Sequence, residues 1–426
     1  MKIEKLKLTN FRGARDLTLD LSPNLEVFYG ENGAGKSTVI DAIARMLTWL
    51  VNRLQRAGSS GKPVLEEEIT NGQGSAVIEI WGRDRERSIC WQLAKQRKGQ
   101  RELEQKSNLN YLNDYVKQLH NEVPFHSLFA SVPVFVYYPV NRSVVDIPLR
   151  IKGRHTFDIW STYDESLTRA ANFRTFFEWF RECEDQENEI NASRKAAVKH
   201  TDFRLEAVRQ ALTAFLPEFR NFRVRRTPLR MEVDKNGKTL NVCQLSDGEK
   251  CLIALVGDLA RRLAIANSSI SHMLKDEDLL QGAGVVLIDE VDLHLHPTWQ
   301  RLIVPGLLKT FPNCQFILST HSPHVITHVQ PENLYMLKQS ENGMTAERPN
   351  ESYGKTVDRI LEDLMGLTTT RPDDVNKILQ EIFLAIDKRD IKLAGKLIEG
   401  LDLTLRNDPE IIKAEALIRR MEIIGK

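Results

Sequence analysis

The sequence predicts an α/β protein that combines a mixed, largely parallel sheet with an antiparallel N-terminal β part. Residues 2–9 and 17–21 alternate apolar and polar side chains, as half-buried antiparallel strands do. Residues 25–29 form a short apolar stretch, and the very apolar runs at 285–289 and 315–320 are typical of short strands buried on both faces of a parallel sheet. A short helical insertion and a helical C-terminal tail complete the predicted architecture.

We divide the chain into an N-terminal lobe (1–150), a helical arm (151–221), a C-terminal lobe (222–350) and a helical tail (351–426). Apolar periodicity and turn residues predict six further features: a helix at 36–54, an antiparallel pair at 76–81 and 88–93, a strand at 132–138, helices at 173–190 and 203–215, and a hairpin of strands 222–233 and 238–242 that turns at 234–237. The residues after His321 read as helices. Because no apolar heptad persists in the arm, we expect no long coiled coil there.

Bulk composition narrows the setting of the protein. The 59 Lys and Arg residues nearly balance the 58 Asp and Glu residues, so any contact with DNA must come from a local patch. The five cysteines include no CxxC pair, which argues against a disulfide framework and a zinc site. No leader-like N-terminus and no apolar run of about 18 residues are present, so we expect a cytoplasmic protein without a membrane partner.

A phosphate-binding motif follows the predicted strand at 25–29. Residues 30–37, GENGAGKS, match GxxxxGK[ST] between a strand and a helix, the context that this motif requires. Glycines let backbone N–H groups curl around phosphates, and the helix directs its positive end at them. The predicted ATP-binding residues are Asn32, Gly33, Gly35, Lys36, Ser37 and Thr38, with Lys36 at the β- and γ-phosphates and Ser37 on Mg²⁺.

An acidic strand end supplies the predicted catalytic groups. The strand 285–288 runs directly into Asp289 and Glu290, which places two carboxylates at the sheet edge where ligands of open α/β sheets bind. We expect Asp289 to hold Mg²⁺ through water and Glu290 to polarise the attacking water. An Asp-Glu pair at a strand end is common by itself, and the P-loop in the same chain gives it meaning.

Four further motifs resemble those of ABC-type ATPases, in the SMC/RecF/OLD-like branch. Residues 245–250, LSDGEK, resemble the signature motif, although Ser246 and Glu249 also form a helix-capping pattern on their own. The resemblance implies that Ser246, Gly248 and Glu249 contact the ATP of a second subunit, and that His321 senses the γ-phosphate. It also identifies 292–297 as a dimer-contacting loop and implies that Arg12, in Asn10–Gly13, approaches the nucleotide. Arg12 reads equally as a surface charge at a turn.

One motif departs from the general ABC pattern. Where many ABC proteins have a glutamine-bearing loop, residues 137–142 read YYPVNR, a pattern similar to ATPases of the OLD-type and antiviral defence group. This departure puts a Mg²⁺-binding glutamine in doubt and leaves Asn141 or Arg142 as nucleotide contacts. The resemblance to ABC-type heads covers residues 1 to about 340.

Together with the short arm and the charged tail, this pattern resembles the PtuA family, the ATPases of the Septu antiphage system. The resemblance implies a regulatory ATPase that works as a homodimer or higher oligomer, uses ATP and Mg²⁺, and controls a PtuB-like HNH nuclease. Double-stranded DNA would be bound through that complex, and no nuclease activity of its own is expected. The alternatives are a RecF-like repair clamp without a nuclease partner and a defence ATPase that releases a toxin.

Overall fold

The computed structural model describes residues 1–99, 105–122, 131–140, 157–168, 173–193, 200–268, 276–401 and 408–424. The chain folds into two units, Met1–Lys355 and Thr356–Lys426. The predicted α/β fold with an antiparallel N-terminal part and a helical tail is confirmed, and its elements follow one another in the expected order. The larger unit contains all of the nucleotide-binding motifs.

A six-stranded sheet forms the centre of the larger unit. Its strand order is β13-β12-β3-β11-β10-β6, and only β13 runs antiparallel to its neighbour. The strands are β3 (Leu25–Tyr29), β6 (Val134–Tyr138), β10 (Gly284–Ile288), β11 (Cys314–Ser319), β12 (Leu334–Ser340) and β13 (Gly343–Glu347). Every residue of β3, β10 and β11 is buried, as the apolar runs predicted for β10 and β11. Because these strands are parallel, the loops that follow them emerge at one edge of the sheet.

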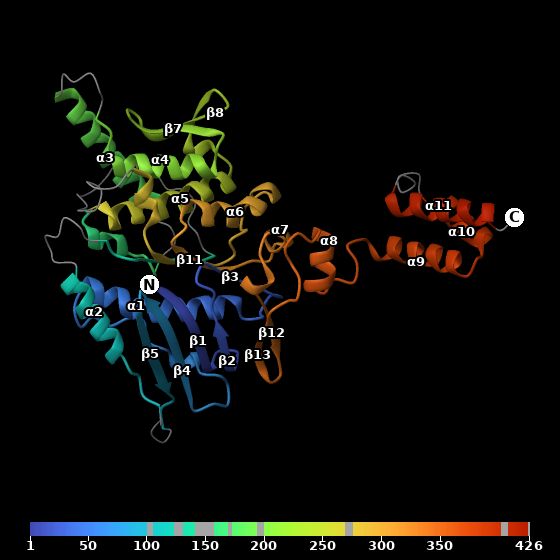
Figure 1. Cartoon of the computed structure of the whole chain (residues 1–426), viewed down its shortest axis with the longest axis horizontal. Coiled ribbons are helices and arrows are strands. Elements are labelled where there is room, and N and C mark those ends of the chain that lie inside the picture. Colours follow the sequence, from blue (N-terminus) through green and yellow to red (C-terminus); the bar gives the residue numbers. More distant parts are fainter. Residues whose placement is uncertain are drawn as a thin grey trace. The chain divides into compact units, whose positions relative to one another are not determined.

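Helix α1 (Lys36–Gln55) separates this sheet from an antiparallel one (Figure 1). The second sheet has the order β2-β1-β4-β5, built from β1 (Lys2–Phe11), β2 (Ala14–Asp20), β4 (Ser75–Asp84) and β5 (Arg87–Gln96). Helix α1 contacts β4 on one side and β11, β10 and β6 on the other, so 13 of its residues are buried. Helix α2 (Asn110–Glu122), which the sequence reasoning did not predict, packs on β5 and α1.

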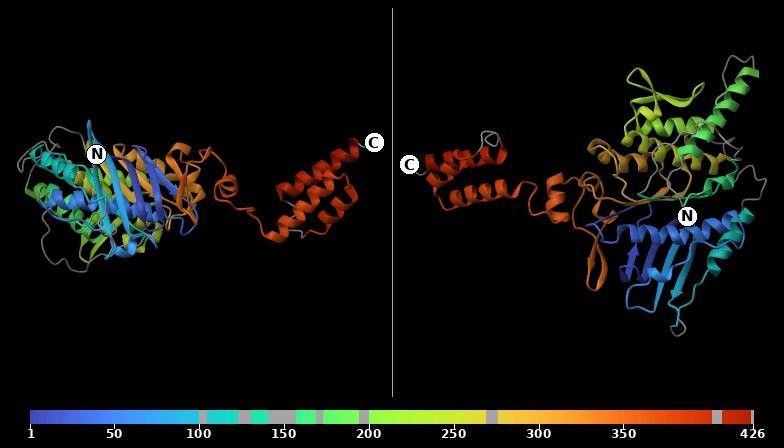
Figure 2. Two further views of the ribbon diagram at one scale, coloured as in Figure 1. Left: turned by 90° about the horizontal axis from the view of Figure 1, so that it is seen from below. Right: turned by 180° about the vertical axis from the view of Figure 1, so that it is seen from behind.

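The opposite face of the six-stranded sheet carries a layer of helices (Figures 1 and 2). They are α3 (Phe173–Ser193), α4 (Phe203–Phe215), α5 (Asp247–Ala266) and α6 (Pro297–Thr310), with the short α7 (Pro323–Ile326) near the sheet edge. Helix α5 contacts α3, α4 and β6 and is buried along almost all of its length. A small sheet of β7 (Phe219–Arg226), β8 (Leu229–Lys235) and β9 (Lys238–Asn241) packs beside α3 and α4. Helices α1 and α5 therefore cover different faces of one sheet.

A buried charge network ties α5 to the central sheet. The Tyr138 hydroxyl, at the end of β6, donates to Asp258 of α5 at 3.0 Å. Arg261 and Arg262 also donate to this carboxylate, at 2.7 and 2.8 Å. Burial raises the pKa of Asp258, but the two arginines overcome that effect and lower it to about 2. Because an unpaired charge is costly in the interior, this network fixes the position of α5 against β6.

Two segments differ from the predictions. The strand expected at 222–233 is two antiparallel strands, β7 (Phe219–Arg226) and β8 (Leu229–Lys235), because Pro228 has no N–H for a sheet ladder and lies in the turn between them. The turn at Asn236-Gly237 leads into β9 (Lys238–Asn241) as expected. The residues after His321 are not all helical, because 334–347 form β12 and β13. The Asn342-Gly343 turn, with φ of 113° at Gly343, is the local signal for that hairpin.

The smaller unit, Thr356–Lys426, is helical and has its own core. It contains α8 (Val357–Arg359), α9 (Asp373–Asp387), α10 (Ile391–Glu399) and α11 (Pro409–Ile424). Its buried side chains include Leu379, Ile382, Ile386, Ala394, Ile398 and Ile411. In the described parts of both units, no helix has the length and apolarity to cross a bilayer.

Candidate nucleotide-binding site

The turn between β3 and α1 has the backbone geometry of a phosphate-binding loop. Gly33 and Gly35 have φ angles of 81° and 98°, in the left-handed region that favours glycine. A Cβ on Gly35 would overlap the Met344 sulfur, whereas one on Gly33 would meet nothing within 4 Å. The loop is therefore packed on its inner side and open on its outer side. Asn32, Gly33 and Ser37 are exposed, and Thr38 is half-buried.

Lys36 begins α1 and holds a buried ammonium group inside this turn. Its Nζ donates to the carbonyl oxygens of Gly30 and Glu31, each at 2.9 Å. An ammonium has three N–H donors, so one remains without a protein partner among the described residues. Burial lowers the pKa of Lys36, and the carboxylates of Asp289 and Glu290 partly oppose that shift. The buried ammonium group of Lys36 can therefore bind an anion through its remaining N–H donor.

The acidic residues that follow β10 lie near Lys36, and β11 separates β10 from β3 in the sheet. Asp289 is almost fully buried, and the Ser319 hydroxyl donates to its carboxylate. The Glu290 backbone N–H donates to the same hydroxyl at 2.8 Å. Glu290 has a φ of 48°, a strained conformation for a residue with a side chain. Ser319, at the end of β11, thus fixes the geometry of both acids, and the sequence reasoning did not identify it as a site residue.

His321 joins the same group of charges. Asp292 accepts hydrogen bonds from the Thr320 hydroxyl at 2.5 Å and from the His321 backbone N–H at 3.3 Å. Burial lowers the pKa of the His321 imidazole, and the positive charge of Lys36 lowers it further against the opposing pull of the carboxylates. The structure therefore brings the predicted residues Lys36, Asp289, Glu290 and His321 together at one sheet edge.

Arg12 lies beside this site and contacts Asp41 of α1. Its guanidinium donates to Asp41 and Glu68 at 2.9 Å each, and the Tyr137 hydroxyl donates to Asp41 at 2.9 Å. Asp41 lies one helical turn after Ser37, a spacing that marks it as a neighbour of the phosphate loop. Sequence reasoning missed Asp41, Glu68 and the role of Tyr137. A nucleotide contact for Arg12 stays a prediction, and Asn141 and Arg142 lie outside the described residues.

The signature motif is not at the phosphate loop of its own chain. Ser246 caps α5: its backbone N–H and its hydroxyl each donate to Glu249 at 2.8 Å, and Lys235 pairs with the same carboxylate. A Cβ on Gly248 would lie 2.5 Å from the His294 carbonyl, so the motif packs on the loop after Glu290. Figure 1 shows α1 and α5 on opposite faces of the central sheet. Ser246 is exposed.

The donors at the sheet edge fit ATP with Mg²⁺. Ser37 and Asp289 offer hydroxyl and carboxylate oxygens, the ligand type that Mg²⁺ prefers. Among the described residues no group of three or more His, Cys, Asp or Glu side chains forms a metal cage. A Mg²⁺ at Ser37 and Asp289 would also be held by phosphates and water, because Mg²⁺ keeps several waters in such sites. The open outer side of Gly33 and the spare Lys36 donor provide for the phosphates.

This fold and site define a P-loop ATPase. Residues 26–327 match the family model described as "AAA domain, putative AbiEii toxin, Type IV TA system", and the chain belongs to that family.

The chain is similar to two named relatives and to one solved structure. The chain is 32% identical to a retron Ec83 probable ATPase from Escherichia coli over 443 residues, which cover 89% of this chain and 79% of that protein. It is 25% identical to the Septu protein PtuA from Bacillus thuringiensis, over 95% of this chain and 94% of the relative. The SMC head domain from Thermotoga maritima covers 82% of this chain and 100% of its own, with 16% identity and a TM-score of 0.42. The predicted resemblance to the PtuA family is confirmed.

Proposed function

We propose that this protein binds and hydrolyses ATP between two copies of the chain. The observation that carries the proposal is the division of the motifs over the sheet. Lys36, Asp289, Glu290 and His321 gather at one edge, while the exposed Ser246 begins a helix on the other face. A second copy that offers its Ser246 and the N-terminus of its α5 would complete the phosphate site, because helix N-termini attract anions.

Each side chain then has a defined task. Lys36 and the backbone N–H groups of the loop bind the β- and γ-phosphates, and Ser37 with Asp289 would hold Mg²⁺, which would neutralise charge on the phosphates. Glu290 accepts a proton from the attacking water as general base. His321, kept neutral by its lowered pKa, presents an imidazole nitrogen to the γ-phosphate. Asp292 orients the backbone of that histidine.

Replacing Ser246 by arginine is expected to leave ATP binding largely intact and to block hydrolysis. A long cation at this exposed position interferes with a partner's phosphate site, whereas the phosphate loop of its own chain begins α1, the helix on the other face of the sheet. Binding is measured with a fluorescent ATP analogue and hydrolysis by phosphate release. Asp390→Arg is the matched control, since it removes the N-cap of α10 in the smaller unit. Loss of the cap alone costs about 1 kcal/mol of stability.

Mixing this variant with Lys36→Ala tests whether the signature acts across the dimer. One site of a heterodimer takes its Lys36 from the Ser246→Arg chain and its Ser246 from the other chain, so it is intact. We therefore expect recovered turnover in the mixture. No turnover from purified heterodimers would contradict the two-chain site while leaving the single-chain phosphate site in place.

In the cell, we propose that the ATPase is the sensor and regulatory subunit of an antiphage defence complex that controls an HNH nuclease. The named relatives, a Septu PtuA and a retron ATPase, support this task. Co-purification with the product of the neighbouring gene, followed by plasmid cleavage with and without ATP, tests it. We expect a stable complex whose cleavage depends on nucleotide. A lone ATPase that binds DNA and cuts nothing would favour a RecF-like clamp instead.

A further inference from the structure

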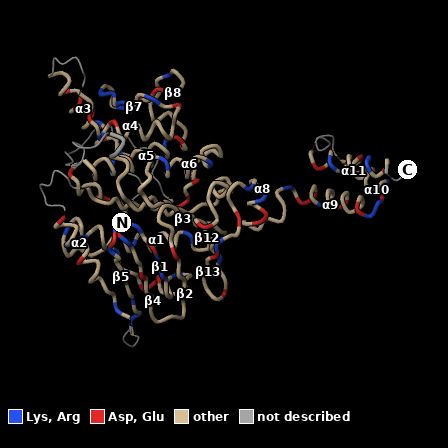
Figure 3. Tube along the Cα trace, viewed as in Figure 1, with Lys and Arg blue, Asp and Glu red and all other residues tan. Residues whose placement is uncertain are grey.

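The small sheet β7-β8-β9 concentrates positive charge that the ATP site does not use. Residues 219–241 contain seven Lys and Arg and two Asp and Glu, a net charge of +5, whereas the whole chain has a net charge of +1. The rest of the chain is therefore negative overall, and β7 stands out in Figure 3 by its blue segments. The sheet β7-β8-β9 is therefore a local basic patch in a protein with a nearly neutral composition.

Strand alternation places these arginines on the outer face of the sheet. Phe222 and Val224 are buried on the inner face, so Arg223 and Arg225 of β7 point outward. Together with Arg230 of β8 they surround one carboxylate, Glu232, at 3.5, 3.9 and 2.6 Å respectively. Three guanidinium groups share this one acid, although Arg223 also pairs with Asp234. The outer face thus keeps a surplus of positive charge.

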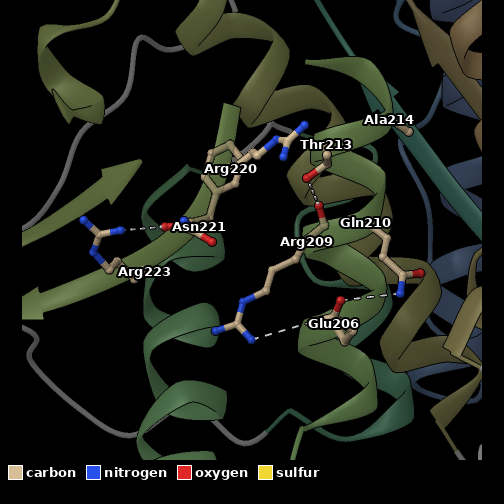
Figure 4. Close-up of a pocket in the computed structure, with 9 residues that line it drawn as sticks. Glu206, Arg209, Gln210, Thr213, Ala214, Arg220, Asn221 and Arg223 are labelled. Atoms are coloured by element: carbon tan, nitrogen blue, oxygen red, sulfur yellow. Dashed lines mark hydrogen bonds and ion pairs between the residues drawn. The ribbon is translucent and has the colours of Figure 1, made fainter. Parts of the chain in front are cut away.

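Three hollows make this face a continuous surface. The largest, about 830 Å³, lies between α4 and β7 and is lined by Arg209, Arg220 and Arg223 among others (Figure 4). It shares Arg223 with a hollow of about 500 Å³ over Glu232. It shares Arg220 with a third of about 530 Å³ beside the turn at Gly237. We call the outer side chains of Arg220, Arg223, Arg225 and Arg230 the arginine surface.

Two of its arginines are poised to bind a ligand. The side chain of Arg220 is exposed and, among the described residues, makes no hydrogen bond or ion pair, and Figure 4 draws no interaction from its guanidinium. The side chain of Arg225 is 57% exposed, and its nearest carboxylate oxygen is 3.9 Å away. In contrast, Arg223 is held by Asp234 at 3.1 Å and Arg209 by Glu187 at 3.4 Å. Arg209 and Arg223 therefore shape the largest hollow, whereas the exposed side chains of Arg220 and Arg225 can contact a ligand.

We propose that the arginine surface binds the phosphate backbone of nucleic acid directly. Guanidinium groups match phosphate oxygens in paired hydrogen bonds, and rows of arginine are the usual electrostatic footprint of such binding. An acidic protein partner would need apolar or aromatic anchors as well. The hollow over Glu232, which Arg223, Arg225 and Arg230 line, contains only Leu240 as an apolar side chain. This goes beyond the proposed function, which assigns DNA only to the whole complex.

The surface is also connected to the signature motif. Lys235, at the end of β8, forms an ion pair with Glu249, and Glu249 accepts a hydrogen bond from the Ser246 hydroxyl. Strand β9 leads within a few residues to Ser246. Nucleic acid on the arginine surface would therefore lie next to the helix end that the proposed dimer offers to ATP.

Fluorescence anisotropy with a labelled random-sequence DNA duplex tests this proposal. The chain is used alone, without nucleotide, over a series of salt concentrations. We expect the double variant R220E/R225E to bind at least about tenfold more weakly, with a slope of log affinity against log salt that is shallower by about two, since each phosphate contact contributes about 0.9. The control R87E/K338E makes the same change in charge at exposed side chains of β5 and β12. It should bind like the wild type.

The possible failures are distinct. Wild-type affinity in R220E/R225E would overturn the proposal, and so would an equal loss in both double variants, because only bulk charge would then matter. Binding of polyglutamate in place of the duplex would overturn it in favour of an acidic protein partner. R220Q/R225Q, which adds no acid beside Glu232, guards against a folding defect and should also weaken binding. Since no ATP or nuclease is present, failure here leaves the proposed function untouched.

Discussion

Replacing Lys36 by alanine is expected to abolish ATP binding. In the described part of the site, Lys36 is the buried cation at the open turn, with a spare N–H donor. Burial lowers the pKa of its ammonium, so the folded protein already carries the free-energy cost of removing this charge from water. In the complex, phosphate oxygens stabilise the ammonium. The alanine variant therefore destabilises the ATP complex more than it destabilises the free protein. We expect at least about 100-fold weaker binding, which corresponds to about 2.8 kcal/mol.

Isothermal titration with ATP and Mg²⁺ measures this effect, and Lys62→Ala serves as the control because Lys62 is an exposed lysine shortly after α1. His321 gives a second readout. Lys36 contributes to the lowered pKa of His321, so that pKa should rise in the variant when followed by NMR. The His321 signal is assigned with His321→Gln. Normal ATP affinity in Lys36→Ala would refute the site, and an unchanged histidine pKa would contradict the proximity of the two groups.

The fold followed from local patterns wherever burial is uniform. Strands β3, β10 and β11 are short, apolar and buried on both faces, so their sequences alone identify them. The hairpin β12–β13 escaped prediction because β12 is only partly buried and its side chains mix apolar with polar types. Its Asn342-Gly343 turn was the available signal. Pro228 gave the same kind of warning inside the predicted strand 222–233.

The site was predictable only to the extent that it is contiguous in sequence. The residues of the phosphate loop and the pair Asp289–Glu290 stand in short motifs, and the structure brings them together. Asp41 stands in no such motif, and Ser319 stands beside the motif residue His321 without a role that the sequence assigns to it. Their importance comes from hydrogen bonds to Asp289 and Tyr137 across different strands and helices. Pairing of this kind depends on the three-dimensional register, which a single sequence does not contain.

Glu290→Gln is expected to keep ATP binding and to stop hydrolysis. Glutamine has nearly the shape of glutamate, and the backbone N–H of residue 290 donates to the Ser319 hydroxyl. The strained φ of 48° should therefore persist. What disappears is the carboxylate that accepts the proton of the attacking water. General-base catalysis contributes about 100- to 10,000-fold, so we expect the turnover rate to fall by that factor.

The stalled variant also reports on assembly. If ATP joins two chains, blocked hydrolysis should accumulate the closed dimer, visible by size-exclusion chromatography with light scattering in the presence of ATP and Mg²⁺. Glu86→Gln is the matched control, because Glu86 lies exposed in the turn between β4 and β5 and makes the same exchange outside the phosphate site. It should turn over like the wild type. Unchanged turnover in Glu290→Gln would rule out Glu290 as the base. Slow turnover without a dimer would keep the base and argue against a site shared between two chains.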